Sequence, residues 1–378
     1  METNKVYTKQ MKINIGPQHP STHGVLRLIL DLEGEIIKNT EVKIGYLHRG
    51  LEKMAESRSF LQYLPLVDRI DYLSSFFCSQ AFCSAVESLC LIDEDVPKKA
   101  QYIRVLLMEL NRIASHLLWL GTFLLDLGAS SIFFYCFKER EKIIRIFESI
   151  TGSRMMYNFF KFGGVKSDIK VDDLDDIEQF TQSFISELKI CENIITDNPI
   201  FYLRTKNIGI LDSKTALNYS ITGGNLRSSG ICLDFRKSKP YAIYNKIDFK
   251  TPIKFDGDSY SRYIIRIEEM KQSICIIKQC IDWLKSNRDL PFDLEINQIL
   301  LRSKSDDNTA TSYIESPRGL LACSVFANKG DEKPNRVKWR TGSFYAVQIL
   351  PLLLEDMEYA DLMSIFGSLD IVLPEVDR

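Results

Sequence analysis

The sequence lacks the motifs that would mark a self-contained metal or nucleotide site. It has nine cysteines, but none of them forms a Cys-x-x-Cys pair, which argues against a zinc ribbon or an iron–sulfur cluster held by this chain alone. An odd number of scattered cysteines is typical of reduced thiols in a cytosol-like compartment. Walker, G-x-G-x-x-G and G-x-S-x-G patterns are also missing, so nothing predicts a bound dinucleotide or serine hydrolase chemistry.

Strong charge of one sign and long apolar runs are absent as well. The formal net charge is −2 over 378 residues, so no basic surface argues for nucleic acid. The longest uncharged run in the most apolar region, residues 113–125, is too short to span a bilayer. The first ten residues, METNKVYTKQ, contain no apolar segment of a signal peptide. We therefore expect any membrane association to go through partner proteins.

The most distinctive segment that is present is GPQHPSTHG, residues 16–24. Its prolines fix φ and its glycines permit positive φ, so it predicts a stiff loop that presents His19 and His23. The apolar run VLRLIL follows it and predicts a buried strand that anchors the loop. One interpretation is a surface turn with incidental histidines. A metal pair is disfavoured outside a helix, which leaves an imidazole that donates a hydrogen bond to a carbonyl ligand.

The pattern of apolar residues predicts a mainly helical α+β protein, in one domain that spans residues 1–378. Residues 11–46 are β-rich, with a hairpin turn near Gly34. A helical core is expected over 51–195, with one helix from about residue 67 and a central helix over about 100–125. The rest, 196–378, is expected to be loop-rich and α/β, with helices at about 261–287 and 350–367.

Four polar residues of the predicted helical core are candidates for chemistry, because buried polar groups are costly unless they are paired. They are Tyr72, Arg112, His116 and Asp126. The structural alternatives are a core histidine, an arginine paired with Glu109 or Glu87, and an aspartate that caps a helix or pairs with an arginine. A basic loop carries Arg227, Arg236 and Lys237. It is either an ordinary solvated loop or a docking surface for an anionic cofactor or partner.

Several long segments, in order along nearly the whole chain, resemble the D-type (49-kDa-type) subunit of respiratory complex I, NADH:quinone oxidoreductase. In photosynthetic relatives the same protein is the H-type subunit. The segments are GPQHPSTHGVLRL, GYLHRGLEKMAE, DRIDYL, IASHLLWLGTFLLDLGA, FKEREKI, TGSRMMYNFFKFGGV, ALNYSITGGNLRSSGICLDFRK, RIEEMKQSI and the terminal EVDR. The resemblance implies the fold of nickel–iron hydrogenase large subunits, with N-terminal β elements and a central helix bundle. The metal-binding cysteine pairs of those hydrogenases are missing here, which implies that no metal is bound.

The resemblance also implies a function and the residues that carry it. The chain would be the quinone-binding peripheral-arm subunit of a proton-translocating NAD(P)H:quinone oxidoreductase, an enzyme only within the complex. A B-type neighbour would hold the terminal iron–sulfur cluster and share the quinone cavity. His23 and Tyr72 would hydrogen-bond the quinone, and Asp126 would pair with His23. Arg49 would lie near the neighbour's cluster.

The implied partners are the B-type and C-type subunits and the quinone-channel membrane subunit, with electrons from NAD(P)H or another donor. The implied place is the cytoplasmic face of a bacterial plasma membrane, or the matrix or stromal face in an organelle. A membrane-bound hydrogenase would need the missing cysteine pairs. A scaffold with degraded catalysis is disfavoured because His23, Tyr72 and Asp126 are all present.

The chain departs from the family pattern at a few positions. Cys78 and Ser79 stand where many relatives carry Asn and Glu, which predicts a reshaped cavity wall. Met156 stands where many relatives carry His, which predicts weaker coupling between the redox state of the cluster and protonation. A redox titration of the cluster with undiminished pH dependence would refute that prediction. Residues 288–311 match the pattern poorly and receive no assignment.

Overall fold

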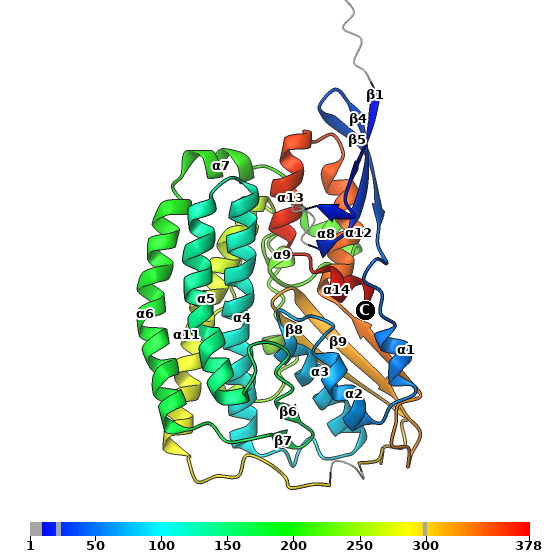
Figure 1. Cartoon of the computed structure of the whole chain (residues 1–378), viewed down its shortest axis with the longest axis vertical. Coiled ribbons are helices and arrows are strands. Elements are labelled where there is room, and N and C mark those ends of the chain that lie inside the picture. The colour runs from blue at the N-terminus through cyan, green and yellow to red at the C-terminus, as the bar shows by residue number, and fades with distance from the viewer. Residues whose placement is uncertain (1–9, 20–23, 298–300) are drawn as a thin grey trace, which may run out of the picture.

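The computed structural model describes residues 10–19, 24–297 and 301–378. Four long helices run side by side as a bundle, and two three-stranded sheets lie to one side of that bundle (Figure 1). The bundle consists of α4 (Lys98–Asp126), α5 (Ser130–Thr151), α6 (Val171–Ile195) and α11 (Ser259–Ser286). This arrangement confirms the predicted mainly helical α+β class. The likeness to hydrogenase large subunits and the single domain stay predictions.

Helix α4 lies at the centre of the described structure because its sequence is apolar on almost every side. It packs against α5 and α11, and 23 of its 29 residues are buried. Two of its buried polar side chains, Arg104 and His116, contact acids on other elements, Glu87 and Glu269. Pro97 precedes its first turn, where a missing amide donor costs nothing. The central helix expected over about 100–125 is thus confirmed.

The N-terminal sheet has the antiparallel order β1-β4-β5, from β1 (Gln10–Ile15), β4 (Arg27–Glu33) and β5 (Ile36–Lys43). Leu28, Leu30 and Leu32 alternate inward along β4, and Gly34 turns the chain with a φ of 66°. The sheet packs on α12 (Gly342–Leu354). The β-rich segment and the hairpin near Gly34 are confirmed. Two short strands, β2 (Gln18–His19) and β3 (Gly24–Val25), pair beside it.

The second sheet has the antiparallel order β10-β9-β8 and lies against α3 (Ser75–Leu89). Its strands are β8 (Thr309–Ser316), β9 (Gly319–Phe326) and β10 (Arg336–Arg340). The remaining elements are short: α1 (Leu51–Ala55), α2 (Phe60–Val67), β6 (Phe160–Lys161), β7 (Gly164–Val165), α7 (Pro199–Thr205), α8 (Ser213–Asn218), α9 (Gly223–Arg227), α10 (Phe235–Ser238), η2 (Tyr244–Lys246), η4 (Tyr359–Asp361), α13 (Leu362–Leu369) and α14 (Leu373–Asp377).

The expected last helix over 350–367 is wrong in its bounds. Helix α12 starts at Gly342, ends at Leu354 and is followed by α13 after a break. The run FYAVQILPLLL is apolar at nearly every position, so its periodicity does not separate a strand from a buried helix. Packing of this run on the N-terminal sheet and on α13 and α14 makes it a helix.

Two apolar cores hold the described residues together. The larger fills the bundle and the space between α3 and the second sheet. The smaller lies between the N-terminal sheet, α12 and α13. Among the residues that the structure describes, no helix has both the length and the apolarity needed to cross a membrane.

Candidate functional site

Tyr72 lies in the connection between α2 and α3, and not within a helix that runs from about residue 67, as was expected. The Asp71 carboxylate accepts hydrogen bonds from the Leu73 amide, at 3.1 Å, and from the Ser74 hydroxyl. Such side-chain bonds compete with a helical backbone, so α3 begins only at Ser75. The half-buried Tyr72 side chain therefore lines a hollow beside α4.

That hollow, which we call the Tyr72 pocket, has a volume of about 200 Å³. One wall comes from α4 and the other from the segment that ends α13. Besides Tyr72, the lining residues are Leu73, Leu118, Trp119, Thr122, Phe366, Gly367, Asp370, Ile371 and Val372. Most of this surface is apolar, with a phenol and a carboxylate as its ionisable groups. It can therefore hold a flat apolar ring that also offers hydrogen-bond acceptors.

A buried ion cluster of Arg318, Asp71 and Asp370 lies next to the Tyr72 pocket. Arg318 donates to Asp71 at 2.6 Å and to the Ser115 hydroxyl at 3.0 Å. Its Nε lies 3.5 Å from the Asp370 carboxylate. Because this arginine is shared between two acids, each acid is held in place by a charge that water scarcely reaches.

The electrostatics of the cluster keep the Tyr72 hydroxyl protonated. Burial raises the pKa of Tyr72, and the neighbouring Asp71 charge raises it further, whereas Arg318 and Arg140 act in the opposite direction. The net rise keeps the phenol a hydrogen-bond donor at neutral pH. Glu375 is also buried. Burial and the neighbouring Asp71 charge raise the pKa of Glu375 to about 7.

The sequence pattern did not single out Arg318 or Asp370. Arg318 lies in the turn between β8 and β9, and Asp370 follows α13 with a left-handed φ of 56°. A non-glycine residue at such a φ is uncommon and worth attention, but φ is not visible in a sequence. The nearest signal was the resemblance of the terminal EVDR to the family, a few residues further on.

Asp126 is the last residue of α4 and is half-buried. Thr122, which lines the Tyr72 pocket, lies one helical turn before it on the same face. The structure thus places Asp126 one turn beyond the pocket. Its predicted partner His23 lies outside the described residues, so the His23–Asp126 pair stays a prediction.

Arg49 is exposed and lies on the loop that ends at α1. It does not line the Tyr72 pocket. Its guanidinium donates to the Arg69 carbonyl at 2.8 Å and to the Pro374 carbonyl at 3.4 Å. The loop is also fastened to α14, because the Asp377 carboxylate accepts from the amides of Gly45 and Leu47 at 2.8 Å each. Arg49 is therefore a positioned surface cation that bonds the backbone at Arg69, three residues before Tyr72.

Arg112 and His116 have structural roles, as the alternatives proposed. Arg112 pairs with Glu109 at 3.1 Å, and His116 lies 2.9 Å from Glu269, all without solvent exposure. Burial alone would raise the pKa of Glu109, but Arg112 and Arg236 hold it down to about 2. The His116–Glu269 pair links α4 to α11, whereas the Arg112–Glu109 pair lies within α4, and none of the four residues lines the Tyr72 pocket.

The basic loop is neither solvated nor a docking surface at its arginines. Arg227 is buried and pairs with Glu315 at 2.7 Å and with Glu269. Arg236 is also buried and pairs with Asp234 at 2.8 Å. Both interpretations of this loop were wrong for the arginines, because Arg227 meets acids from distant parts of the chain and Arg236 is buried with the neighbouring Asp234 and the distant Glu109.

One of the positions that depart from the family pattern, Ser79, contacts another buried carboxyl, Asp68. Ser79 donates to one oxygen of Asp68, and the Asn158 amide donates to the other at 2.7 Å. Burial raises the pKa of Asp68 to about 6. Met156, two residues before Asn158, has a left-handed φ of 54°. Cys78 is buried, and neither it nor Ser79 lines the Tyr72 pocket.

Within residues 10–19, 24–297 and 301–378, no group of three His, Cys, Asp or Glu side chains is arranged to hold a metal ion. Acids such as Asp71 and Asp370 are instead paired with Arg318.

Comparison with known proteins shows the family. Residues 126–306 and 295–378 match the family described as respiratory-chain NADH dehydrogenase, 49 Kd subunit. The D-type subunit of the NADH-quinone oxidoreductase of Bacillus mycoides (strain KBAB4) is 42% identical over 372 residues, which cover 98% of this chain and 100% of that protein. The protein of the same name from Geobacillus thermodenitrificans (strain NG80-2) is 44% identical over 370 residues, 98% of this chain and 99% of its own length. The chain therefore belongs to the 49-kDa subunit family of respiratory-chain NADH dehydrogenase, as its motifs predicted.

Proposed function

We propose that this chain forms one wall of the quinone-reduction cavity of a proton-translocating NADH:quinone oxidoreductase. The observation that carries the proposal is the Tyr72 pocket, where a protonated phenol faces an apolar hollow backed by Asp71 and Arg318. At about 200 Å³, this hollow is smaller than a typical ligand site. It suits the quinone headgroup, with the rest of the cavity supplied by the B-type neighbour.

Quinone reduction is favoured by hydrogen-bond donors that are held in place in a site without water. Two-electron reduction places negative charge on the two quinone oxygens, and a preorganised donor stabilises that charge as it develops. Tyr72 is the donor for one oxygen. Trp119 and Phe366 offer apolar surface to the ring and keep water away. The electrons come from the iron–sulfur cluster that we place in the B-type neighbour, near Arg49.

The second donor in this proposal is His23, backed by Asp126 at the end of α4. An imidazole changes charge near neutral pH and so can deliver a proton to the reduced quinone. Delivery of that proton changes the net charge of the His23–Asp126 pair. We infer that this change starts the conformational step that drives proton translocation.

The other proposed partners are the C-type subunit and the quinone-channel membrane subunit, with NAD(P)H as the electron source. The chain would sit on the cytoplasmic side of the membrane, or on the matrix or stromal side in an organelle, held there by these partners.

The test replaces Tyr72 by Phe and, separately, His23 by Ala in the assembled complex. The matched control is Tyr135→Phe, because Tyr135 is 44% exposed on α5. Loss of one preorganised donor should lower quinone reductase activity roughly 10²-fold. Oxidation of NADH by a soluble acceptor that takes electrons before the quinone site should stay unchanged. Normal quinone reduction by both variants in a fully assembled complex would show that the site is wrong.

A further inference from the structure

Two cysteine thiols meet where helices α5 and α6 pack side by side in the bundle (Figure 1). Cys136 belongs to α5 and Cys191 belongs to α6, and a hydrogen bond joins their thiol groups. Cys136 is 1% exposed and Cys191 is 6% exposed, and both are free thiols. Because the side chains already point toward each other, a disulfide between the two helices needs only a closer approach of the two sulfur atoms.

The hydrogen bond makes the two thiols chemically unequal. It lowers the pKa of Cys191 and raises the pKa of Cys136, which burial raises further. Burial and nearby glutamates such as Glu187 act against a thiolate at Cys191, but Glu187 lies 3.6 Å from the Lys138 ammonium. Since the thiolate is the reactive form of a cysteine, Cys191 is the thiol that reacts first and Cys136 is the thiol that can then attack it.

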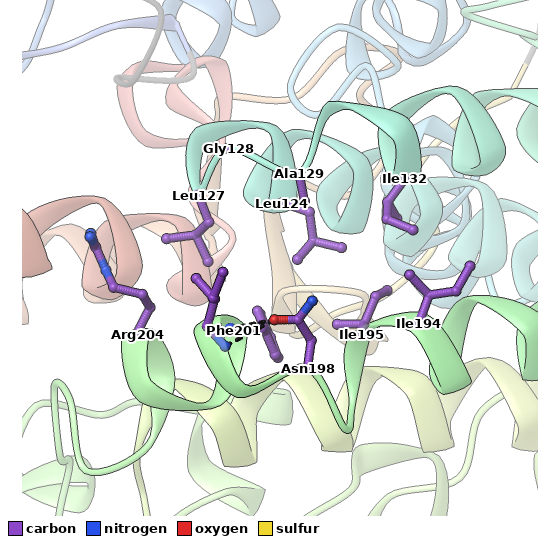
Figure 2. A pocket seen from close by; sticks show the side chains of 11 residues that line it. Leu124, Leu127, Gly128, Ala129, Ile132, Ile194, Ile195, Asn198, Phe201 and Arg204 are labelled. Carbon is purple, nitrogen blue, oxygen red and sulfur yellow. Dashed lines mark hydrogen bonds between the residues drawn. The ribbon is translucent and has the colours of Figure 1, made fainter.

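A groove at the end of the bundle brings small molecules close to these thiols. It has a volume of about 250 Å³ and lies between the α4–α5 turn, the end of α6 and helix α7 (Figure 2). Ile132 of α5 and Ile195 of α6 line it. Cys136 follows Ile132 by four residues and Cys191 precedes Ile195 by four, so each thiol lies on the groove side of its helix, about 6 Å further along the axis. A space of this size admits a molecule as small as hydrogen peroxide.

We propose that Cys136 and Cys191 are a reversible oxidation site, at which hydrogen peroxide or another small peroxide converts the two thiols into a disulfide between α5 and α6. The inference does not depend on the proposed quinone site, because neither cysteine lines the Tyr72 pocket. In a reducing compartment, disulfides are usually transient and redox-sensing. A pair that rests as free thiols, joined by a hydrogen bond and one helical turn from a groove, fits that role.

The reaction balances with peroxide as the only oxidant. The Cys191 thiolate attacks one peroxide oxygen and the O–O bond breaks, which leaves a sulfenic acid at Cys191 and releases water with the proton of the first thiol. The Cys136 sulfur then attacks the Cys191 sulfur, the S–O bond breaks, and the hydroxyl group leaves as a second water with the Cys136 proton. The two thiols lose two electrons in total, and the peroxide gains them. A dithiol reductant restores both thiols by thiol–disulfide exchange.

The direct test treats the assembled complex with hydrogen peroxide, denatures it, alkylates the remaining thiols and maps the peptides by mass spectrometry. We expect a peptide pair joined through Cys136 and Cys191 in most copies, and its disappearance after treatment with a dithiol reductant. The matched control pair is Cys83 on α3 and Cys323 on β9, because both are completely buried on elements that pack together and neither lines the groove. These two should stay alkylated. Absence of the Cys136–Cys191 peptide, or an equal yield of a Cys83–Cys323 peptide, would overturn the proposal.

Single variants separate the two thiols by their roles. Cys136→Ala removes the second thiol, so the sulfenic acid at Cys191 should persist and its labelling by a dimedone-type reagent should rise several-fold above wild type. Cys191→Ala should leave Cys136 unlabelled. Labelling of Cys191 that does not rise in Cys136→Ala would overturn the proposal. The peptide map of the wild-type complex decides the question by itself if either variant fails to assemble.

Discussion

Arg318 donates a 2.6 Å hydrogen bond to Asp71, the residue that immediately precedes Tyr72. This ion pair joins the turn between β8 and β9 to the connection between α2 and α3, 247 residues apart in the sequence. The position of the Tyr72 phenol is thus set by a contact between two distant segments. Substitutions at Arg318 should therefore alter the site without touching the substrate.

Replacing Arg318 by lysine should weaken quinone binding. Lysine keeps the charge but loses the planar fork that reaches Asp71 and Ser115 together. The loss of one charge-assisted hydrogen bond is worth roughly 1.4 kcal/mol, which corresponds to about a tenfold rise in the KM for quinone. Steady-state kinetics of the assembled complex measure it. An unchanged KM would mean that the cluster does not position Tyr72.

Replacing Gly16 by alanine should disturb the loop that carries His23. Gly16 has a φ of +85°, and an added Cβ would lie 1.9 Å from the Leu26 carbonyl oxygen. Gly50 is the matched control, because its φ is +67° but an added Cβ would meet nothing within 4 Å. We expect Gly50→Ala to cost about 1–2 kcal/mol for the left-handed backbone alone, and Gly16→Ala to cost more and to lower quinone reduction. Equal unfolding free energies for the two variants would contradict this.

Replacing Arg104 by methionine should destabilise the fold strongly. Arg104 donates to Glu87 at 2.7 Å and to the Gly164 carbonyl at 2.9 Å, all in the interior. The variant leaves Glu87 buried without its cation, which costs about 3–5 kcal/mol. Arg145→Met removes the exposed pair with Glu141 and should cost less than about 0.5 kcal/mol. Denaturant unfolding of both variants measures the difference, and similar midpoints would refute it.

Asp68 should make stability depend on pH below neutrality. Its folded-state pKa of about 6 lies above the ordinary value of 3.8, so the folded state binds this proton more tightly than the unfolded state. The stabilisation is complete below about pH 4 and is lost as the pH rises through 6, by about 3 kcal/mol.

Asp68→Asn should remove that step, because the amide does not titrate. The measurement is the difference in unfolding free energy between the wild-type protein and the variant at intervals from pH 4 to 7. It should change in favour of the variant as the pH rises. Parallel curves would show that Asp68 keeps an ordinary pKa in the folded protein.

Local patterns predicted the parts of the fold that local physics determines. The hairpin at Gly34 and the central helix α4 over Lys98–Asp126 follow from alternation and from a long apolar helical pattern. For Arg112 the sequence left two acidic partners open, Glu109 and Glu87, and the structure pairs it with Glu109. The bounds of α12 were not predicted, because an apolar run takes its conformation from what it packs against.

Of the candidate site, the resemblance named Tyr72, which lines an apolar hollow, and its role as a quinone donor stays a prediction. Arg318 and Asp370 had no local signal. The interpretation of the basic loop was wrong because a sequence shows that Arg227 is charged, but not that Glu269 and Glu315 pair with it in the interior. Pairings between distant segments are the part that a single sequence does not reveal.

The fastening of the Arg49 loop by Asp377 also bears on how this protein is made. The Gly45 and Leu47 amides are held by a carboxylate 332 and 330 residues later in the chain. On the ribosome, the loop has no such anchor until residues 374–378 have been synthesised and released from the exit tunnel. The surface that carries Arg49 therefore cannot take its final form before residues 374–378 are available to it.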